Sequence, residues 1–116
     1  MAEGFANCYG SDVLSAESFG LAPVPRVPRQ GIVAMSEKNI DISNHVSRRY
    51  MPINGAQADI VVNMSEYPLP GSAPKNLIVW NVVDPYGQPL EAFQKTRDEI
   101  ETHVMRLILD IRKGKI

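Results

Sequence analysis

Apolar positions recur at helical spacing over the last part of the chain, from Pro89 onward. For about seven turns they mark one face at intervals of three and four residues, as in an amphipathic helix. The face consists of Leu90, Phe93, Arg97, Ile100, Val104, Leu107, Ile108 and Ile111, of which Arg97 alone is polar. Arg112, Lys113 and Lys115 suit the negative pole of the helix dipole, and Gly114 can end the helix. The segment therefore predicts a long helix with one face against the core.

Two shorter helices are predicted nearer the N-terminus. From Met1 to about Tyr9, apolar residues recur at spacings of three and four, and Gly10 follows where a helix can end. Pro28 suits the first turn of the second helix, and Asn39 is a candidate for its left-handed terminator. The residues expected to face inward on the second helix are Ile32 and Met35.

Three short segments have the character of strands. Residues 12–18, DVLSAES, alternate enough for a short strand, whereas 59–64 and 77–82 are valine-rich and apolar, which favours buried strands. Residues 65–76 contain three prolines and predict a loop. Residues 44–50 are less periodic and indicate a short helical turn, which the turn signal Asn54-Gly55 follows.

The predicted order is helix, strand, helix, turn, strand, loop, strand and helix. Continuous apolar strands that alternate with helices predict an α/β protein whose parallel sheet is covered on both faces. Such sheets bind their ligands beyond the carboxyl ends of the strands. Asp84 directly follows the last predicted strand, so the sequence places a carboxylate at this edge of the sheet.

Composition narrows the class of protein. With 116 residues, of which 44% are hydrophobic, the chain suits one compact domain with one core. Twelve basic and thirteen acidic residues nearly cancel, which excludes a broad electrostatic attraction to nucleic acid or to an anionic membrane. The longest apolar runs fall far short of the roughly 20 residues that cross a bilayer. The N-terminus lacks the pattern of a secretory signal, so we expect a cytoplasmic protein.

Cysteine and histidine are too few for most metal or redox chemistry. The single cysteine, Cys8, excludes an intramolecular disulfide, a multi-cysteine zinc site and electron transfer among several thiols of one chain. His45 and His103 lie far apart without acidic residues at ligand spacing, so neither a metal site nor a cofactor is predicted. A phosphate-cradling cysteine loop requires an arginine six positions after the cysteine, where this chain has Leu14. We expect Cys8 to be a small buried hydrophobe.

The residues around Asp84 allow two interpretations. An aspartate before Pro85 is typical of a turn, yet a carboxylate on a stiff loop at the sheet edge also suits a general acid. Trp80 and Tyr86 flank Asp84 and either wall an aromatic pocket or lie in the core and at its rim. His45 either caps a turn or braces a neighbouring loop.

Five stretches in the same order are similar to one known family. They are MAEGFA (1–6), NIDISNHVSRR (39–49), ADIVVNM (58–64), IVWNVVDPYG (78–87) and FQKTRDEIETHV (93–104). Together they resemble the low-molecular-weight protein tyrosine phosphatases and the thioredoxin-coupled arsenate reductases that share their fold. The resemblance implies a single domain, residues 1–116, with a three-layer α/β sandwich around a short parallel sheet, of the phosphotyrosine phosphatase I-like (flavodoxin-like) type.

In that family a first strand leads into a loop with a nucleophilic cysteine and, after five intervening residues, an arginine that cradles phosphate or arsenate. The resemblance places the start of this chain at the next helix, so the domain is expected to be N-terminally truncated, without its central first strand or cradle. Asp84 then matches the aspartate that protonates the leaving oxygen. Tyr86, with Trp80 beside it, matches the wall of the substrate cleft, and His45 matches a histidine that supports the cradle.

The resemblance thus implies a parent protein that binds phosphate or phosphotyrosine-type ligands and hydrolyses phosphate monoesters through a cysteinyl-phosphate intermediate. This chain is expected to be inactive because it lacks the nucleophile. Two alternatives stay open: a non-catalytic interaction or oligomerisation domain, and an arsenate reductase-like protein. The family's reductases use further cysteines after the strand at 59–64, where this chain has NMSEYP, and this difference favours a phosphatase parent.

Loss of the first strand has a physical consequence. In the family this strand lies between those matching residues 13–18 and 59–64. Its absence leaves backbone groups unpaired at roughly 1–3 kcal/mol each, against a total stability of about 5–15 kcal/mol. Three outcomes are expected: the flanking strands close together, a second copy fills the gap by strand exchange, or two chains pair through exposed edges. We favour a homodimer or a strand-exchanged oligomer.

Overall fold

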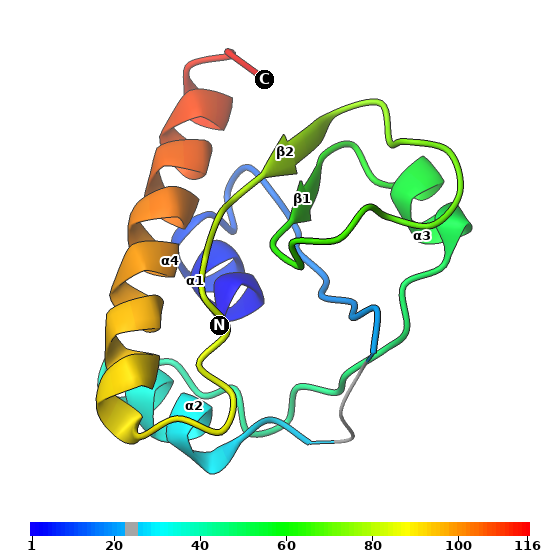
Figure 1. Cartoon of the computed structure of the whole chain (residues 1–116). Coiled ribbons are helices and arrows are strands. Elements are labelled where there is room, and N and C mark those ends of the chain that lie inside the picture. Colours follow the sequence, from blue (N-terminus) through cyan, green and yellow to red (C-terminus); the bar gives the residue numbers. More distant parts are fainter. Residues whose placement is uncertain (23–25) are drawn as a thin grey trace.

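A computed structural model describes residues 1–22 and 26–116, and α4 is the longest element in this part of the chain (Figure 1). The elements are α1 (Ala2–Tyr9), α2 (Arg29–Ser36), α3 (Pro52–Gln57), β1 (Val61–Asn63), β2 (Leu77–Val79) and α4 (Leu90–Arg112). The three predicted helices and the two valine-rich strands are thus confirmed, although both strands are shorter than predicted. Asn39 has the predicted left-handed backbone, with a φ of 60°.

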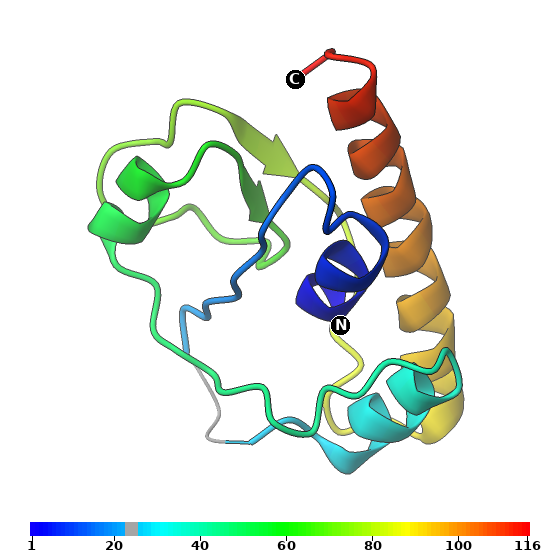
Figure 2. The same ribbon diagram turned by 180° about the vertical axis from the view of Figure 1, so that it is seen from behind.

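The molecule has two halves, which Figures 1 and 2 show from opposite sides. The helical half comprises α1, α2 and α4, and both shorter helices pack against α4. The strand half comprises α3, β1 and β2. The least exposed large side chains are Phe5, Met35, Ile42, Val104 and Ile108, most of which belong to the helical half. The core is therefore centred on α4.

Gly10, at the end of α1, is required by packing rather than by its backbone angle. Its φ of −118° is open to any residue, but a Cβ here would lie 2.8 Å from the side chain of Ile108. Protein interiors are close-packed, so a methyl group at this distance would force a shift. The glycine lets the end of α1 approach α4 closely.

Arg97 interrupts the apolar face of α4 and connects α4 to α2. The residue is 9% exposed, and its Nη1 donates hydrogen bonds to the carbonyl oxygen of Ala34 (2.9 Å) and to Glu37 Oε1 (2.7 Å). Its Nε donates to Asp98 Oδ1 at 2.9 Å. Burial of a charge is tolerated when it is paired and hydrogen-bonded. The single polar position on the face thus has a structural role at the interface of two helices.

The two strands pair in parallel, with Val61 opposite Leu77 and Asn63 opposite Val79. This confirms the predicted parallel sheet. The prediction that the sheet is covered on both faces is wrong for β2, because Leu77 is 40% and Val79 60% exposed. Ile78 points to the other face and packs against the core. The helices pack against one another on α4, and the outward face of β2 stays in solvent.

The strand predicted at residues 12–18 is also wrong. Residues 14–19 run without a strand ladder, and a single parallel bridge joins Gly20 to Arg49. A strand needs a neighbour for its backbone groups. Here the side chain of Asn7 supplies one, since its Oδ1 accepts from the N–H of Ala16 (2.8 Å) and its Nδ2 donates to the Ala16 oxygen (3.0 Å). Within the described residues the sheet has two strands, and the stretch from 14 to 19 does not pair with β1.

The helical turn predicted at residues 44–50 does not form either, and α3 follows this segment instead. Pro52 opens α3 at a position where a missing N–H costs nothing. The Asn54 side chain accepts a hydrogen bond from the N–H of Met51 at 2.7 Å. The Asn54-Gly55 pair therefore lies inside a short helix rather than at a turn. Among the described helices, none combines the length and the apolar character needed to cross a membrane.

Candidate functional site

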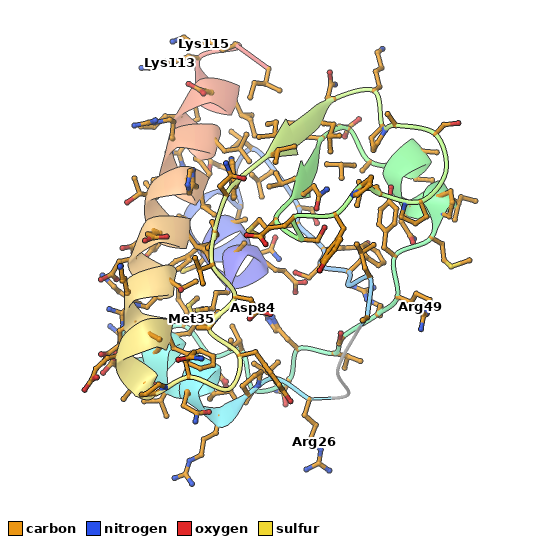
Figure 3. All side chains as sticks on the ribbon, in the orientation of Figure 1. Arg26, Met35, Arg49, Asp84, Lys113 and Lys115 are labelled. Atoms are coloured by element: carbon orange, nitrogen blue, oxygen red, sulfur yellow. The ribbon has the colours of Figure 1, made fainter. Side chains whose placement is uncertain are left out.

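Asp84 lies on the connection between β2 and α4, beyond the carboxyl ends of both strands (Figure 3). Val82 and Pro85 are buried and anchor this connection, while Asp84 itself is exposed. Its Oδ1 accepts a hydrogen bond from the N–H of Tyr86 at 3.0 Å. Asp84 thus closes an Asx turn, as the structural interpretation of the sequence predicted.

Contacts on both sides of Asp84 fix the loop. The Oγ1 of Thr96, on α4, donates to the carbonyl oxygen of Val83 at 3.3 Å. The N–H of Gln88 donates to the Pro85 oxygen at 2.9 Å, and Gly87 adopts a φ of 79°, which is open to glycine at no steric cost. The backbone that carries the carboxylate is therefore held by α4 and by its own turn.

The first turn of α1 packs against the same part of the core. Met1 contacts the core cluster that contains Trp80 and Val82, the residues that lead to Asp84. Burial lowers the pKa of the Met1 α-amino group, and the nearby carboxylate of Glu3 opposes this shift.

His45 reaches α1 from the loop that follows α2. Its ring Nδ1 lies 3.5 Å from Oε2 of Glu3. The backbone N–H of His45 donates a hydrogen bond to the carbonyl oxygen of Ile42 at 3.1 Å. In the same loop, hydrogen bonds from Ser43 hold the pKa of Asp41 below its usual value. His45 is therefore in contact with the first turn of α1. Sequence reasoning did not single out Glu3, because its partner is remote in the chain and no local pattern links them.

The two aromatic residues near Asp84 have different environments. Tyr86 is 61% exposed at the rim of the loop. Trp80 is buried in the core, where its ring stacks on His103 with centroids 4.9 Å apart. Trp80 is thus a core residue, which is one of the two interpretations of the sequence. The ring of Tyr86 is exposed and accessible to a ligand.

The structure does not place an arginine of the neighbouring loops against Asp84. Figure 3 shows that Arg26 and Arg49 point outward, away from Asp84. Arg48 lies over the ring of Phe19, 4.9 Å from its centroid, in a cation–π contact. These residues are engaged with their own loops or with solvent.

Cys8 is exposed, so the prediction of a buried thiol is wrong. It lies in the last turn of α1, on a face that neither α4 nor the sheet covers, and the spacing of apolar residues had marked other positions for burial. No cluster of histidine, cysteine and acidic residues suited to a metal ion occurs among the described residues.

A hollow of about 730 Å³ lies at the opposite end of the sheet, where α3 faces the stretch from Ser72 to Asn76. Asp59 and Lys75 line it at the amino ends of the two strands. Asp84 lies beyond the carboxyl ends. The candidate acid and this hollow therefore lie at opposite ends of the sheet.

The chain is similar to known proteins in both sequence and structure. No family model matches the chain. The glutaredoxin arsenate reductase of Synechocystis sp. is 32% identical over 115 residues, which cover 96% of this chain and 87% of that protein. Arsenate reductase 2 of Staphylococcus epidermidis is 36% identical over 110 residues, which cover 90% of this chain and 82% of that protein.

Solved structures agree with these sequence relatives. An arsenate reductase in the phosphate binding state has a TM-score of 0.84 and 32% identity, over 95% of this chain and 86% of that one. A low-molecular-weight protein tyrosine phosphatase from T. tengcongensis has a TM-score of 0.80 and 24% identity, over 94% and 88%. The second similarity concerns the fold alone. The α/β fold with a short parallel sheet that the resemblance implied is therefore confirmed.

Proposed function

Since the chain belongs to the arsenate reductase family, whose fold the low-molecular-weight tyrosine phosphatases share, we propose that Asp84 is the general acid of an oxyanion site. The nucleophile of that site is not supplied by these 116 residues. The chain by itself therefore neither hydrolyses phosphate monoesters nor reduces arsenate. Its ligands are tetrahedral oxyanions, in keeping with a relative described in a phosphate binding state.

The observation that carries the proposal is the loop of Asp84. An exposed carboxylate stands on a backbone that its own turn and Thr96 hold in place. Only Oδ1 is engaged in that turn, and no described residue binds Oδ2. A general acid needs this combination of a fixed position and an oxygen that can carry a proton toward solvent or substrate.

The proposed inactivity follows from the thiol count. A two-electron reduction of arsenate by thiols ends in a disulfide, and a relay within one chain needs at least two cysteines. Cys8 is the only cysteine, and it lies at the carboxyl end of α1, where the helix dipole does not activate a thiolate. Position 14 is Leu14 rather than an anion-binding arginine. We propose Tyr86, exposed beside Asp84, as part of the cleft wall, and His45, in contact with Glu3, as a support of the site.

The first experiment measures hydrolysis of an aryl phosphate, and reduction of arsenate with an added dithiol. We expect no turnover above the uncatalysed rate. Measurable turnover that disappears in Asp84→Asn would contradict the proposed inactivity. Asp84→Ala is the matched control, because asparagine keeps the acceptor for the Tyr86 N–H whereas alanine removes the turn.

The second experiment locates the oxyanion. Phosphate is titrated into the chain, and the backbone amide shifts are followed by NMR. The negative charge of Asp84 repels the anion, so Asp84→Asn should bind phosphate about two- to fivefold more tightly. Asp59→Asn, at the other end of the sheet, is the control and should change nothing. Shifts centred on the Asp59 end would contradict the assignment of Asp84.

A second candidate function, an interaction domain that self-associates, rests on β2. Leu77 and Val79 are exposed on its outward face, and the described residues do not pair with its outer edge. An unprotected, apolar edge strand favours pairing with another chain. We propose a homodimer through this edge, which Val79→Lys should dissociate. A stable wild-type monomer by light scattering at micromolar concentration would exclude it.

A further inference from the structure

Positive charge is concentrated in two stretches of the chain that contain no aspartate or glutamate, residues 18–36 and 42–58. All thirteen acidic residues lie elsewhere, so the small net charge of −1 is unevenly distributed. Apart from His45, which contacts Glu3, the charged residues of the two stretches are Arg26, Arg29, Arg48 and Arg49. This distribution matters for recognition only if the two stretches meet in space.

The two stretches do meet, and they run side by side in both views of the ribbon (Figures 1 and 2). A parallel bridge joins Gly20 to Arg49. The N–H of Gly20 donates to the carbonyl oxygen of Arg48 at 2.7 Å, and the N–H of Tyr50 donates to the oxygen of Gly20 at 2.9 Å. The rings of Phe19 and Tyr50 meet edge to face, with centroids 6.4 Å apart. Backbone hydrogen bonds and a ring contact thus hold the two stretches together.

Neutral groups orient the two adjacent arginines of this contact. The guanidinium of Arg48 lies over the ring of Phe19, 4.9 Å from the centroid. Nη1 of Arg49 donates a long hydrogen bond, 3.5 Å, to the carbonyl oxygen of Leu21. A guanidinium over an aromatic ring keeps N–H donors at its rim free for a carboxylate. Both side chains are therefore positioned without being neutralised.

The arginines of the two stretches have no acidic partner in the part of the chain that the structure describes. The ion pairs found there are made by Lys38, His45, Arg97 and Arg112 instead. Arg26, Arg48 and Arg49 are exposed, and we call their surface the arginine face. Figure 3 shows Arg26 and Arg49 pointing outward on the side of the molecule remote from α4. The arginine face therefore presents its charge to solvent.

Apolar side chains accompany the charge. Val46 is 69% and Met51 52% exposed, and the two residues flank Arg48 and Arg49 in the sequence. Arginine and methionine are enriched in protein–protein interfaces relative to the rest of a protein surface. A mixture of guanidinium groups and apolar side chains favours a partner that offers both carboxylates and apolar groups.

We propose that the arginine face binds an acidic segment of a partner protein, a short stretch in which carboxylate and apolar side chains are interspersed. Guanidinium groups bind carboxylates with two parallel hydrogen bonds, which makes the pairing geometrically specific. Charges more than about 8 Å apart are largely screened at physiological salt, so the gain is confined to a segment that lies on the face. A nucleic acid would extend onto surface with an excess of negative charge. The face is separate from Asp84 and does not depend on the proposed reaction.

The probe is a capped synthetic peptide of the sequence EEVEELEE, and the control peptide has glutamine in place of every glutamate. Each is titrated into the isotope-labelled chain at low salt, and backbone amide shifts are followed by NMR. The acidic peptide should shift the amides of Gly20, Arg49 and Tyr50, whereas the control should not. Raising the salt to about 0.15 M should weaken binding severalfold, because exposed ion pairs are screened.

Two double variants with the same loss of charge provide the matched test. Arg48→Gln/Arg49→Gln removes two charges from the arginine face and should weaken binding of the acidic peptide by about three- to tenfold. Lys113→Gln/Lys115→Gln removes two charges beyond the end of α4 and should weaken it by less than about twofold. The comparison separates a local surface from the net charge of the chain.

A further variant guards against loss of structure. Arg48→Gln also removes the contact with Phe19, so the unfolding midpoint is measured for each variant. Arg26→Gln leaves that contact in place and should still weaken binding by about twofold.

Three results would overturn the proposal. The first is an absence of amide shifts at millimolar acidic peptide. The second is equal weakening by the two double variants, because the attraction would then reflect net charge alone. The third is a single-stranded oligonucleotide of the same charge that binds the face more tightly than the peptide, because the partner would then be a nucleic acid.

Discussion

The helical half and the strand half of the molecule differ in how fully they bury their apolar side chains. On α4, Val104 and Ile108 are almost completely shielded, and Arg97 finds partners for its charge. On β2, Leu77 and Val79 are as apolar but remain exposed. A helix satisfies its backbone internally, whereas a strand depends on its neighbours. The helical half therefore buries its apolar face on α4, whereas the strand half leaves the outward face of β2 exposed.

The largest difference between the halves is expected on truncation of a core side chain. Phe5→Ala removes a fully buried ring from the interface of α1 and α4 and should cost about 3–5 kcal/mol of unfolding free energy, measured in urea. Val79→Ala in the strand half is the control and should cost less than about 0.5 kcal/mol. Equal losses would show that the exposed face of β2 is covered in solution.

The next effect tests the charge inside the helical half. Arg97→Met keeps much of the side-chain volume but leaves the Ala34 oxygen without its donor, at a cost of about 2–3 kcal/mol. Arg112→Met removes a solvent-exposed pair with Asp12 and should have a much smaller effect. The same unfolding measurement compares the two variants, and a harmless Arg97→Met would show that the network does not hold α2 to α4.

A smaller effect tests packing in the strand half. The Tyr50 hydroxyl is buried without a hydrogen-bond partner among the described residues, and it lies against Gly55 so closely that no Cβ fits. Gly55→Ala should destabilise the chain by about 1–3 kcal/mol. Tyr50→Phe removes the hydroxyl and should restore most of this loss in the double variant. Thermal unfolding of the four proteins measures the coupling, and additive effects would contradict the contact.

The smallest effect is the pH dependence of a surface pair. Hydrogen bonds from Arg112 lower the pKa of Asp12, so the pair stabilises the folded chain above the unfolded-state pKa of aspartate. This contribution is lost as the pH falls through the lowered folded-state pKa. Urea unfolding should therefore show wild type more stable than Asp12→Asn at neutral pH, with the difference disappearing in acid. A difference that grows in acid would contradict this sign.

Local patterns predicted the helices well and the sheet poorly. The apolar face of α4 could be predicted because all of its positions lie on one surface of one helix. The left-handed conformation of Asn39 could be predicted because it depends on the backbone of that residue alone. The stretch at residues 12–18 was predicted as a strand from alternation alone, but strand formation depends on a partner that the described residues do not provide. At residues 44–57 the Asn54-Gly55 pair suggested a turn, although Pro52 and the Asn54 cap form a helix there.

In the candidate site, too, local features were predicted from the sequence and contacts between remote residues were not. Asp84 before Pro85 predicted a turn, and the hydrogen bond to the Tyr86 N–H confirms it. The contact between His45 and Glu3, the stacking of Trp80 on His103 and the exposure of Cys8 had no local signal. They depend on which elements meet in three dimensions.

The sequence by itself determined where α1, α2 and α4 lie, where the Asp-Pro turn lies, and that one cysteine leaves no thiol relay within the chain. Those properties depend on neighbouring residues or on simple counts. Only the tertiary structure decided that Arg97 is a buried connection between α2 and α4, that β2 keeps an apolar face in solvent, and that β1 and β2 pair in parallel. Burial and strand pairing require contact between two segments that are remote in the sequence. The pattern of residues within one segment does not identify the segment that it will contact.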